Sequence, residues 1–181
     1  MRRLWLGLLL CACSGSSDNE VDGTVPGFSF DARDSLYFVH NGRQIVVVSD
    51  QDNTCRKLTS HTMSGQIHLL ELYLWNASAP DPTLLVEGSY EVDDDTVSLE
   101  SQAYFGSGSS CSPDSRWFRA GAGRVIVIRA GDAAPGEREQ VAFRLDFGNQ
   151  IIVTGHADTT FCSIPDTGPI PCINEGNFAP P

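Results

Sequence analysis

The sequence is short of positive charge. It carries 12 Lys and Arg residues against 23 Asp and Glu residues, which gives a formal net charge of −11 at pH 7. A chain with this balance repels the phosphates of nucleic acids and the headgroups of anionic lipids, so the composition argues against binding to either through charge. We therefore expect no nucleic-acid partner.

The N-terminal apolar stretch is also too short for a membrane span. Residues 4–10 follow Arg2 and Arg3 and fall far below the ~20 apolar residues that a membrane-spanning helix needs. A positive start followed by a short apolar segment is typical of an export signal rather than of a permanent anchor. We expect the chain to be exported.

Recognised catalytic motifs are missing too. The sequence has no G-x-S-x-G, H-E-x-x-H or S-x-x-K pattern, and the Gly-rich residues 105–112 lack the strand-to-helix context of a phosphate-binding loop. His40, His61 and His68 show no ligand spacing among them. The sequence therefore predicts no catalytic residues, no metal site and no cofactor.

Two cysteines follow the apolar stretch. Leu10, Cys11, Ala12 and Cys13 resemble the bacterial lipobox, in which Leu stands three places before the modified Cys and a small residue stands just before it. The match predicts acylation of Cys13, because cleavage before Cys11 would put bulky Leu10 at the cleavage position. The alternative is an ordinary secretory signal with incidental cysteines.

Acylation of Cys13 would hold an otherwise water-soluble protein at the membrane of a bacterial cell envelope. Bacterial lipoproteins carry more than one acyl chain, and several chains hold stably where a single chain does not. Ser14 stands where Asp acts as an inner-membrane retention signal in some bacteria, so the resemblance favours the outer membrane. Loss of Arg2 and Arg3 with the signal would change the net charge from −11 to −13.

The composition divides the chain into three segments. Residues 1–12 form the signal peptide, residues 13–27 a flexible tether and residues 28–181 a single domain. The tether is rich in small and acidic residues and shows no apolar periodicity. The mature length suits one hydrophobic core.

From residue 28 onward, apolar residues alternate with polar ones or form short runs between Gly, Pro, Asp and Ser clusters. This pattern predicts eight or nine strands with no convincing helix, and therefore an all-β fold, either an antiparallel β-sandwich or a partly open barrel. The predicted strands cover residues 28–30, 36–39, 45–48, 67–75, 88–92, 97–105, 124–129, 140–147 and 151–161.

Turn signals fix two hairpins. Asn41-Gly42 is a strong hairpin dipeptide between the second and third predicted strands. A three-residue loop at 148–150 keeps the apolar faces of the last two strands together, whereas a slip of one residue would mix them. The resulting register pairs Phe147 with Ile151, Leu145 with Val153, Phe143 with Gly155 and Val141 with Ala157, and the chain ends in a three-stranded meander.

This register places His156 and Asp158 together on the outer face of the last strand. Such a pair could be two metal ligands, or a general base with the carboxylate that orients it. Because Arg144 and Ala142 are the expected neighbours, we interpret it as a solvated surface pair. The acidic segments 91–96 and 49–54 lack the spacing of a calcium loop, so we interpret them as turns.

Four cysteines remain beside Cys13, namely Cys55, Cys111, Cys162 and Cys172. An even set in an exported chain predicts two disulfides, with three possible connectivities. We expect a Cys162–Cys172 bond, because these residues are close in sequence, and a Cys55–Cys111 bond by default. A Cys55–Cys162 bond is the main alternative.

The domain contains GSYEV (88–92), a Cys-bearing loop, GRVIVIRA (123–130), VAFRLDF (141–147) and QIIVTGHADTTFC (150–162). This layout resembles a loose group of uncharacterised bacterial lipoproteins with one β-sandwich domain. The resemblance implies no activity and supplies no catalytic residue.

Two functional classes stay open. The first, which we favour, is a non-enzymatic binding or structural module for a protein or glycan at the cell surface. Its candidate ligand contacts are Tyr73, Trp75 and Trp117, with Tyr104 and Phe118 as further aromatics, although core packing would explain each of them as well. The alternative is a glycan hydrolase whose general acid and base come from Glu87, Glu91, Asp93 and Asp95.

Overall fold

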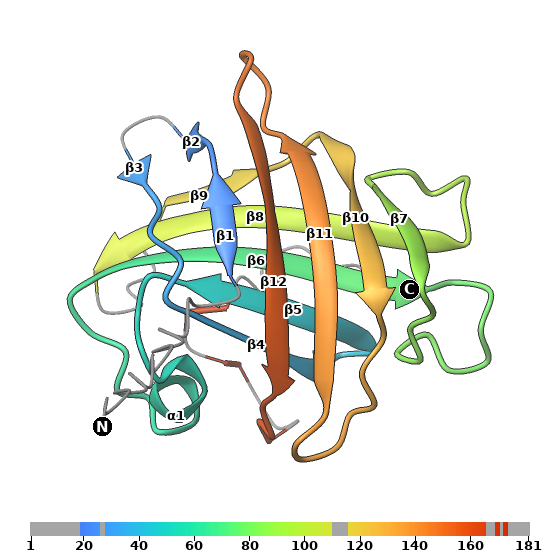
Figure 1. Ribbon diagram of the computed structural model, residues 1–181, viewed down its shortest axis with the longest axis horizontal. Coiled ribbons are helices and arrows are strands. Elements are labelled where there is room, and N and C mark those ends of the chain that lie inside the picture. The colour runs from blue at the N-terminus through green and yellow to red at the C-terminus, as the bar shows by residue number, and fades with distance from the viewer. Residues whose placement is uncertain (1–18, 26–27, 110–115, 166–168, 171, 174–181) are drawn as a thin grey trace, which may run out of the picture.

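The computed structural model describes residues 19–25, 28–109, 116–165, 169–170 and 172–173. The predicted signal peptide, Cys13 and Cys111 lie outside these residues. Strands make up most of the described chain (Figure 1). The elements are β1 (Glu20–Asp22), β2 (Thr24–Val25), β3 (Phe28–Ser29), β4 (Asp34–His40), β5 (Arg43–Ser49), α1 (Thr54–Thr59), β6 (Gln66–Asn76), β7 (Gly88–Val92), β8 (Leu99–Ser109), β9 (Arg116–Arg119), β10 (Ala122–Arg129), β11 (Arg138–Asp146) and β12 (Ile152–Phe161).

Eight strands close into a barrel in the order β12, β11, β10, β7, β8, β6, β5 and β4. The ring closes because Thr160 and Phe161 of β12 pair in parallel with Leu36 and Tyr37 of β4. The predicted all-β class is confirmed. The predicted sandwich is wrong, and the predicted barrel is closed rather than partly open, because this pairing joins the first long strand to the last. The pairs β7–β8 and β12–β4 are parallel, whereas the sequence predicted an antiparallel sheet throughout.

Both predicted hairpins are confirmed, and so is the register predicted for the second. Asn41 and Gly42 have positive φ values of 50° and 71°, as a type I′ turn requires, and join β4 to β5. In the second hairpin, Val141 pairs with Ala157 and Leu145 with Val153. The strands β10, β11 and β12 form the predicted antiparallel meander.

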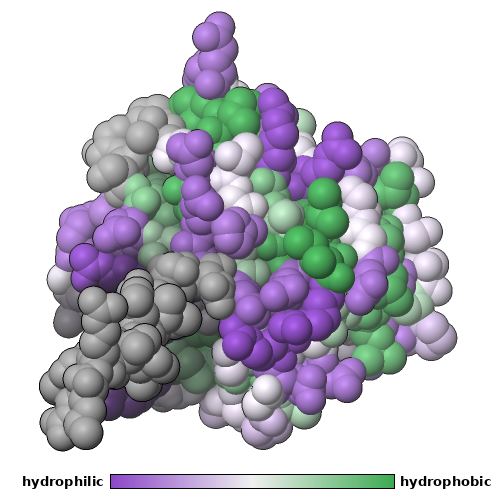
Figure 2. All heavy atoms as spheres, in the orientation of Figure 1, coloured by the Kyte–Doolittle hydropathy of each residue, from purple (hydrophilic) through white to green (hydrophobic). Residues whose placement is uncertain are grey.

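Strand β6 is buried on both faces. Leu70, Leu72 and Leu74 point into the barrel, where they join the interior core. The alternate residues Leu69 and Tyr73 belong to a second core on the outer face, which also contains Leu58, Cys162, Ile170 and Ile173. The outer face of β10–β12 is turned toward the viewer in Figure 1, and Figure 2 shows both hydrophobic and hydrophilic surface there.

Four elements differ from the sequence prediction. Residues 20–22 and 24–25, expected in the tether, form β1, which pairs with residues 154–156 of β12, and β2, which pairs with β3. Strand β9 was not predicted and pairs with β8. Helix α1 was not predicted either, because six residues are too few to show a helical period. It starts where the Thr54 amide donates to Asp34 Oδ2 at 2.6 Å.

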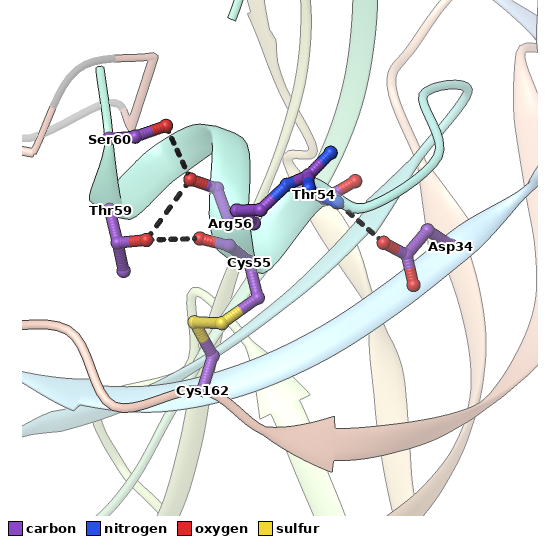
Figure 3. Close-up of a disulfide and its surroundings, with 7 residues drawn as sticks. All are labelled: Asp34, Thr54, Cys55, Arg56, Thr59, Ser60 and Cys162. Carbon is purple, nitrogen blue, oxygen red and sulfur yellow. Dashed lines mark hydrogen bonds between the residues drawn. A yellow bond between two sulfur atoms is a disulfide. The ribbon is translucent and has the colours of Figure 1, made fainter. Parts of the chain in front are cut away.

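The structure joins Cys55 to Cys162, with their Cα atoms 5.7 Å apart (Figure 3). The preferred Cys162–Cys172 pairing, and with it Cys55–Cys111, is therefore wrong, and the alternative is observed. The reason lies in the barrel closure. The Cys162 amide donates to the Tyr37 carbonyl, which extends the β12–β4 pairing and leaves the Cys162 side chain on the outer face, against α1. Cys172 is also disulfide-bonded.

Candidate binding pocket

A pocket of about 480 Å³ opens where four strands meet on the outer surface of the barrel. Trp75 of β6 lies directly across from Glu100 of β8. The other edge of β8 is shared, because β7 pairs with residues 100–101 and β9 with residues 104–107. The pocket is lined by Trp75, Asp93, Asp95, Glu100, Ser101, Gln102 and Arg119.

An ion pair spans one side of this pocket. Arg119 Nη2 lies 2.5 Å from Asp93 Oδ1, and its guanidinium carbon lies 5.9 Å from the centre of the Tyr104 ring. The hydrogen bond to Asp93 raises the pKa of Arg119. Asp93 has a φ of 55°, and this left-handed turn ends β7 at the pocket. The ion pair therefore fixes the loop after β7 against β9.

Glu100 of the pocket has a raised pKa. Burial raises its pKa, and a hydrogen bond from the Trp75 indole opposes this effect. The nearby charges of Asp95 and Asp94 raise the pKa further, whereas Arg43 lowers it. Glu100 therefore keeps its proton to a higher pH than an ordinary glutamate, as a proton donor would.

Trp75 presents little of its ring to the pocket. Its side chain is only 6% exposed, and the Arg43 guanidinium lies 4.8 Å from the ring centre. Tyr73 and Tyr104 are buried in the outer core with their ring centres 5.6 Å apart, and the Tyr73 hydroxyl donates to Glu71. Of these predicted ligand contacts, Trp75 is the one that lines the pocket.

Trp117 lies at a different place. It lines a small hollow of about 20 Å³ with Ile67, Leu69 and Cys172. Gly106 makes room for its ring, because a Cβ atom there would come within 2.2 Å of it. Phe118 packs against the interior core. The predicted aromatic residues therefore do not gather into one surface.

The predicted carboxylates separate into two groups. Asp93 and Asp95 both line the pocket, whereas Glu87 is exposed in the loop before β7 and Glu91 accepts a hydrogen bond from Ser89. Sequence reasoning missed Glu100, Gln102 and Arg119. The signal that could have found them is the register across β6, β8 and β9, but β7 separates β6 from β8 in the sequence.

His156 and Asp158 interact with different partners. Arg138 Nη2 lies 2.7 Å from the Asp158 carboxylate, and Gln140 Nε2 donates to it at 3.2 Å. His156 instead lies 3.8 Å from Glu20. Within the described ranges, no group of three or more His, Cys, Asp and Glu side chains is placed to hold a metal ion.

In the described part of the chain, no helix is long and apolar enough to cross a membrane. No protein-family model matches the chain, and no curated protein or solved structure matches it either.

Proposed function

We propose that this chain is a lipid-anchored protein of the bacterial cell envelope that binds a polar ligand without transforming it. The lipid on Cys13 holds the protein at a membrane, with the outer membrane favoured by Ser14. The observation that supports ligand binding is the pocket that combines three carboxylates with Gln102 and Arg119. Ligand pockets typically hold a few such convergent polar groups.

The chemistry of the pocket indicates the class of ligand. Asp93, Asp95 and Glu100 accept hydrogen bonds, so they favour a ligand rich in hydroxyl or amino groups. An anionic ligand is disfavoured, because Arg119, the cation among the described residues of the lining, is already bonded to Asp93. A glycan fragment that carries amino groups fits these conditions. Recognition rests on hydrogen bonds rather than on stacking, because Trp75 is nearly buried.

One observation favours the alternative, a carboxylate-dependent glycan hydrolase. Glycosidases use one carboxyl that stays protonated and a second that stays ionised. The raised pKa of Glu100 suits the acid, and Asp93 or Asp95 would supply the carboxylate. In this alternative, Glu100 protonates the leaving oxygen.

Titration of the purified lipid-bearing protein with soluble envelope glycans tests both functions. We expect saturable binding of amine-bearing fragments, weaker binding of neutral ones and none of anionic ones. Gln102→Ala should weaken the binding, and Glu87→Gln, which changes a carboxylate outside the pocket, should leave it unchanged. Product formation that is lost in Glu100→Gln would favour the hydrolase. Absence of binding to every fragment would overturn the proposal.

The anchor has its own test. Mass spectrometry of the N-terminal peptide should find an acylated Cys13, and Cys13→Ser should move the protein from the membrane fraction to the soluble fraction. An unmodified N-terminus would overturn the anchor without affecting the pocket.

A further inference from the structure

The outer face of β10–β12 exposes apolar side chains at its centre. Ile126 and Ile128 of β10 are 41% and 52% exposed, and Ile126 pairs across the strands with Ala142. Figure 2 shows hydrophobic surface over this part of the sheet with hydrophilic surface beside it. In the described residues, the other large apolar side chains with such exposure are Leu84 and Val86, in the loop before β7.

Arginines surround these two isoleucines. Arg124 and Arg144 are cross-strand partners, and Arg129 and Arg138 lie toward the other end of the same strands. All four are exposed. The same face carries acidic groups as well, since Glu91 pairs with Arg124, and Arg129 and Arg138 both contact Asp158. Asp158 itself is only 13% exposed, so the arginines cover its charge.

The N-terminal segment joins the barrel at the β12 edge of this face. Asn19 Oδ1 accepts hydrogen bonds from the Asp158 amide and the Ser35 hydroxyl. Asp158 also lines a groove of about 390 Å³ together with Gln140 and Ile128. The point where the N-terminal segment joins the fold is therefore continuous with the surface that carries Ile128.

Because Asn19 is held against β12, only a short segment links the barrel to the lipid proposed on Cys13. Cys13 precedes Asn19 by six positions, and an extended chain of that length spans at most ~20 Å. A domain of this length is roughly 40 Å across. A membrane that holds the acyl chains must therefore lie on the side of the barrel from which Asn19 emerges.

We propose that the outer face of β10–β12 rests on the headgroup layer of the membrane that holds Cys13. Ile126 and Ile128 enter the interface, and Arg124 and Arg144 contact lipid phosphates while their stems cover apolar surface. The partner is the lipid surface, and the inference rests on the anchor proposed above. Net repulsion by the acidic chain is overcome because the link confines this face to the membrane.

Fluorescence quenching in vesicles tests the docking. The acylated Ile128→Trp protein is reconstituted into phosphatidylglycerol-containing vesicles whose acyl chains carry bromine. We expect the added tryptophan emission to shift to the blue and to be mostly lost. Ser60→Trp, which places the probe at the exposed residue after the C-terminal end of α1, is the matched control and should keep its emission.

Charge reversal gives the second measurement. Adding Arg124→Glu and Arg144→Glu to Ile128→Trp should lower the docking equilibrium by at least roughly thirtyfold and restore emission, because each arginine near an anionic surface contributes ~1 kcal/mol. Arg33→Glu with Arg56→Glu makes the same change of net charge elsewhere and should have little effect.

Two outcomes separate docking from anchoring. If acylated Ile128→Trp protein sediments with the vesicles but the introduced tryptophan keeps its emission, docking is overturned and the anchor stays intact. Protein that carries no lipid and does not sediment would overturn both.

Discussion

Asn19 Oδ1 accepts a hydrogen bond of 3.2 Å from the backbone amide of Asp158, 139 positions later in the chain. The Ser35 hydroxyl donates to the same oxygen at 2.7 Å and also lies 3.2 Å from the Asp158 carbonyl. Asp158 sits between the part of β12 that pairs with β1 and the part that pairs with β4. Two side chains thus replace strand pairing at the seam where the barrel closes.

This seam gives the first prediction. Asn19→Ala leaves the Asp158 amide without its acceptor, and we expect the free energy of unfolding to fall by ~1–2 kcal/mol in urea titrations. Glu20→Ala is the control, because this neighbouring side chain is 73% exposed and should change stability by less than ~0.5 kcal/mol. Equal losses in the two variants would contradict a specific role for Asn19.

Glu139 lies fully buried inside the barrel, where Gln44 donates a hydrogen bond to its carboxylate. Burial raises the pKa of Glu139 from 4.5 to about 7, although the hydrogen bonds from Gly131 and Gln44 act in the opposite direction. Between these two pH values the unfolded chain releases the proton and the folded chain keeps it. The contribution of Glu139 to stability is therefore intact below pH 4.5 and is lost as the pH rises to about 7.

Replacing Glu139 tests the direction of this change of stability with pH. Glu139→Gln keeps an oxygen that can accept from Gln44 and has no titration, so its stability relative to the parent should rise by ~3 kcal/mol between about pH 4 and pH 8. Denaturant titrations at the two pH values measure the difference. The control is Glu137→Gln, an exposed neighbour that should follow the parent. An unchanged difference across this range would mean that burial does not raise the pKa of Glu139 in the folded protein.

The parts of the fold that could be predicted are those with local signals. Asn41-Gly42 fixes one hairpin, and the alternation around residues 148–150 fixes another, because each turn joins neighbouring strands. No turn sequence indicates the pairing of Leu36 with Thr160, because it joins strands more than a hundred residues apart. The closure of the barrel could therefore not be predicted from the sequence.

The same distinction applies to the disulfide and to the pocket. Nearness in sequence favoured Cys172 as the partner of Cys162, whereas the non-local closure of the barrel brings Cys55 beside it. Trp75 and Asp93 could be named from residue type alone. The pairings β6–β8, β7–β8 and β8–β9 bring Trp75 and Asp93 close to Glu100 and Arg119, and β6 and β8 are not consecutive strands in the chain.

The cysteine pairing is directly testable. A non-reducing digest should contain a peptide that links Cys55 to Cys162. If Cys13 is acylated, Cys111 is the remaining cysteine of the mature chain that can pair with Cys172. A second linked peptide should therefore join Cys111 to Cys172. Recovery of a Cys162–Cys172 peptide would contradict the structure.

Removal of the observed bond should be costly. The Cys55→Ser, Cys162→Ser double variant loses a link between residues 107 positions apart, and we expect the free energy of unfolding to fall by ~2–5 kcal/mol. Urea titrations of the double variant and of the reduced parent protein measure this loss. A stability equal to that of the oxidised parent would show that the bond does not form in the native protein.

The last prediction concerns the charge of the pocket. Because burial raises the pKa of Glu100, the pocket gains a negative charge as the pH passes through that raised value. The affinity for an amine-bearing glycan should therefore increase with pH, by roughly fivefold for an interaction of ~1 kcal/mol at this partly exposed group. Calorimetric titrations across the acidic range, with a ligand whose amine stays protonated, measure the step. Glu100→Gln should remove it, and Glu91→Gln, on the same sheet but outside the pocket, should preserve it. A step that persists in Glu100→Gln would contradict the assignment of the titration to Glu100.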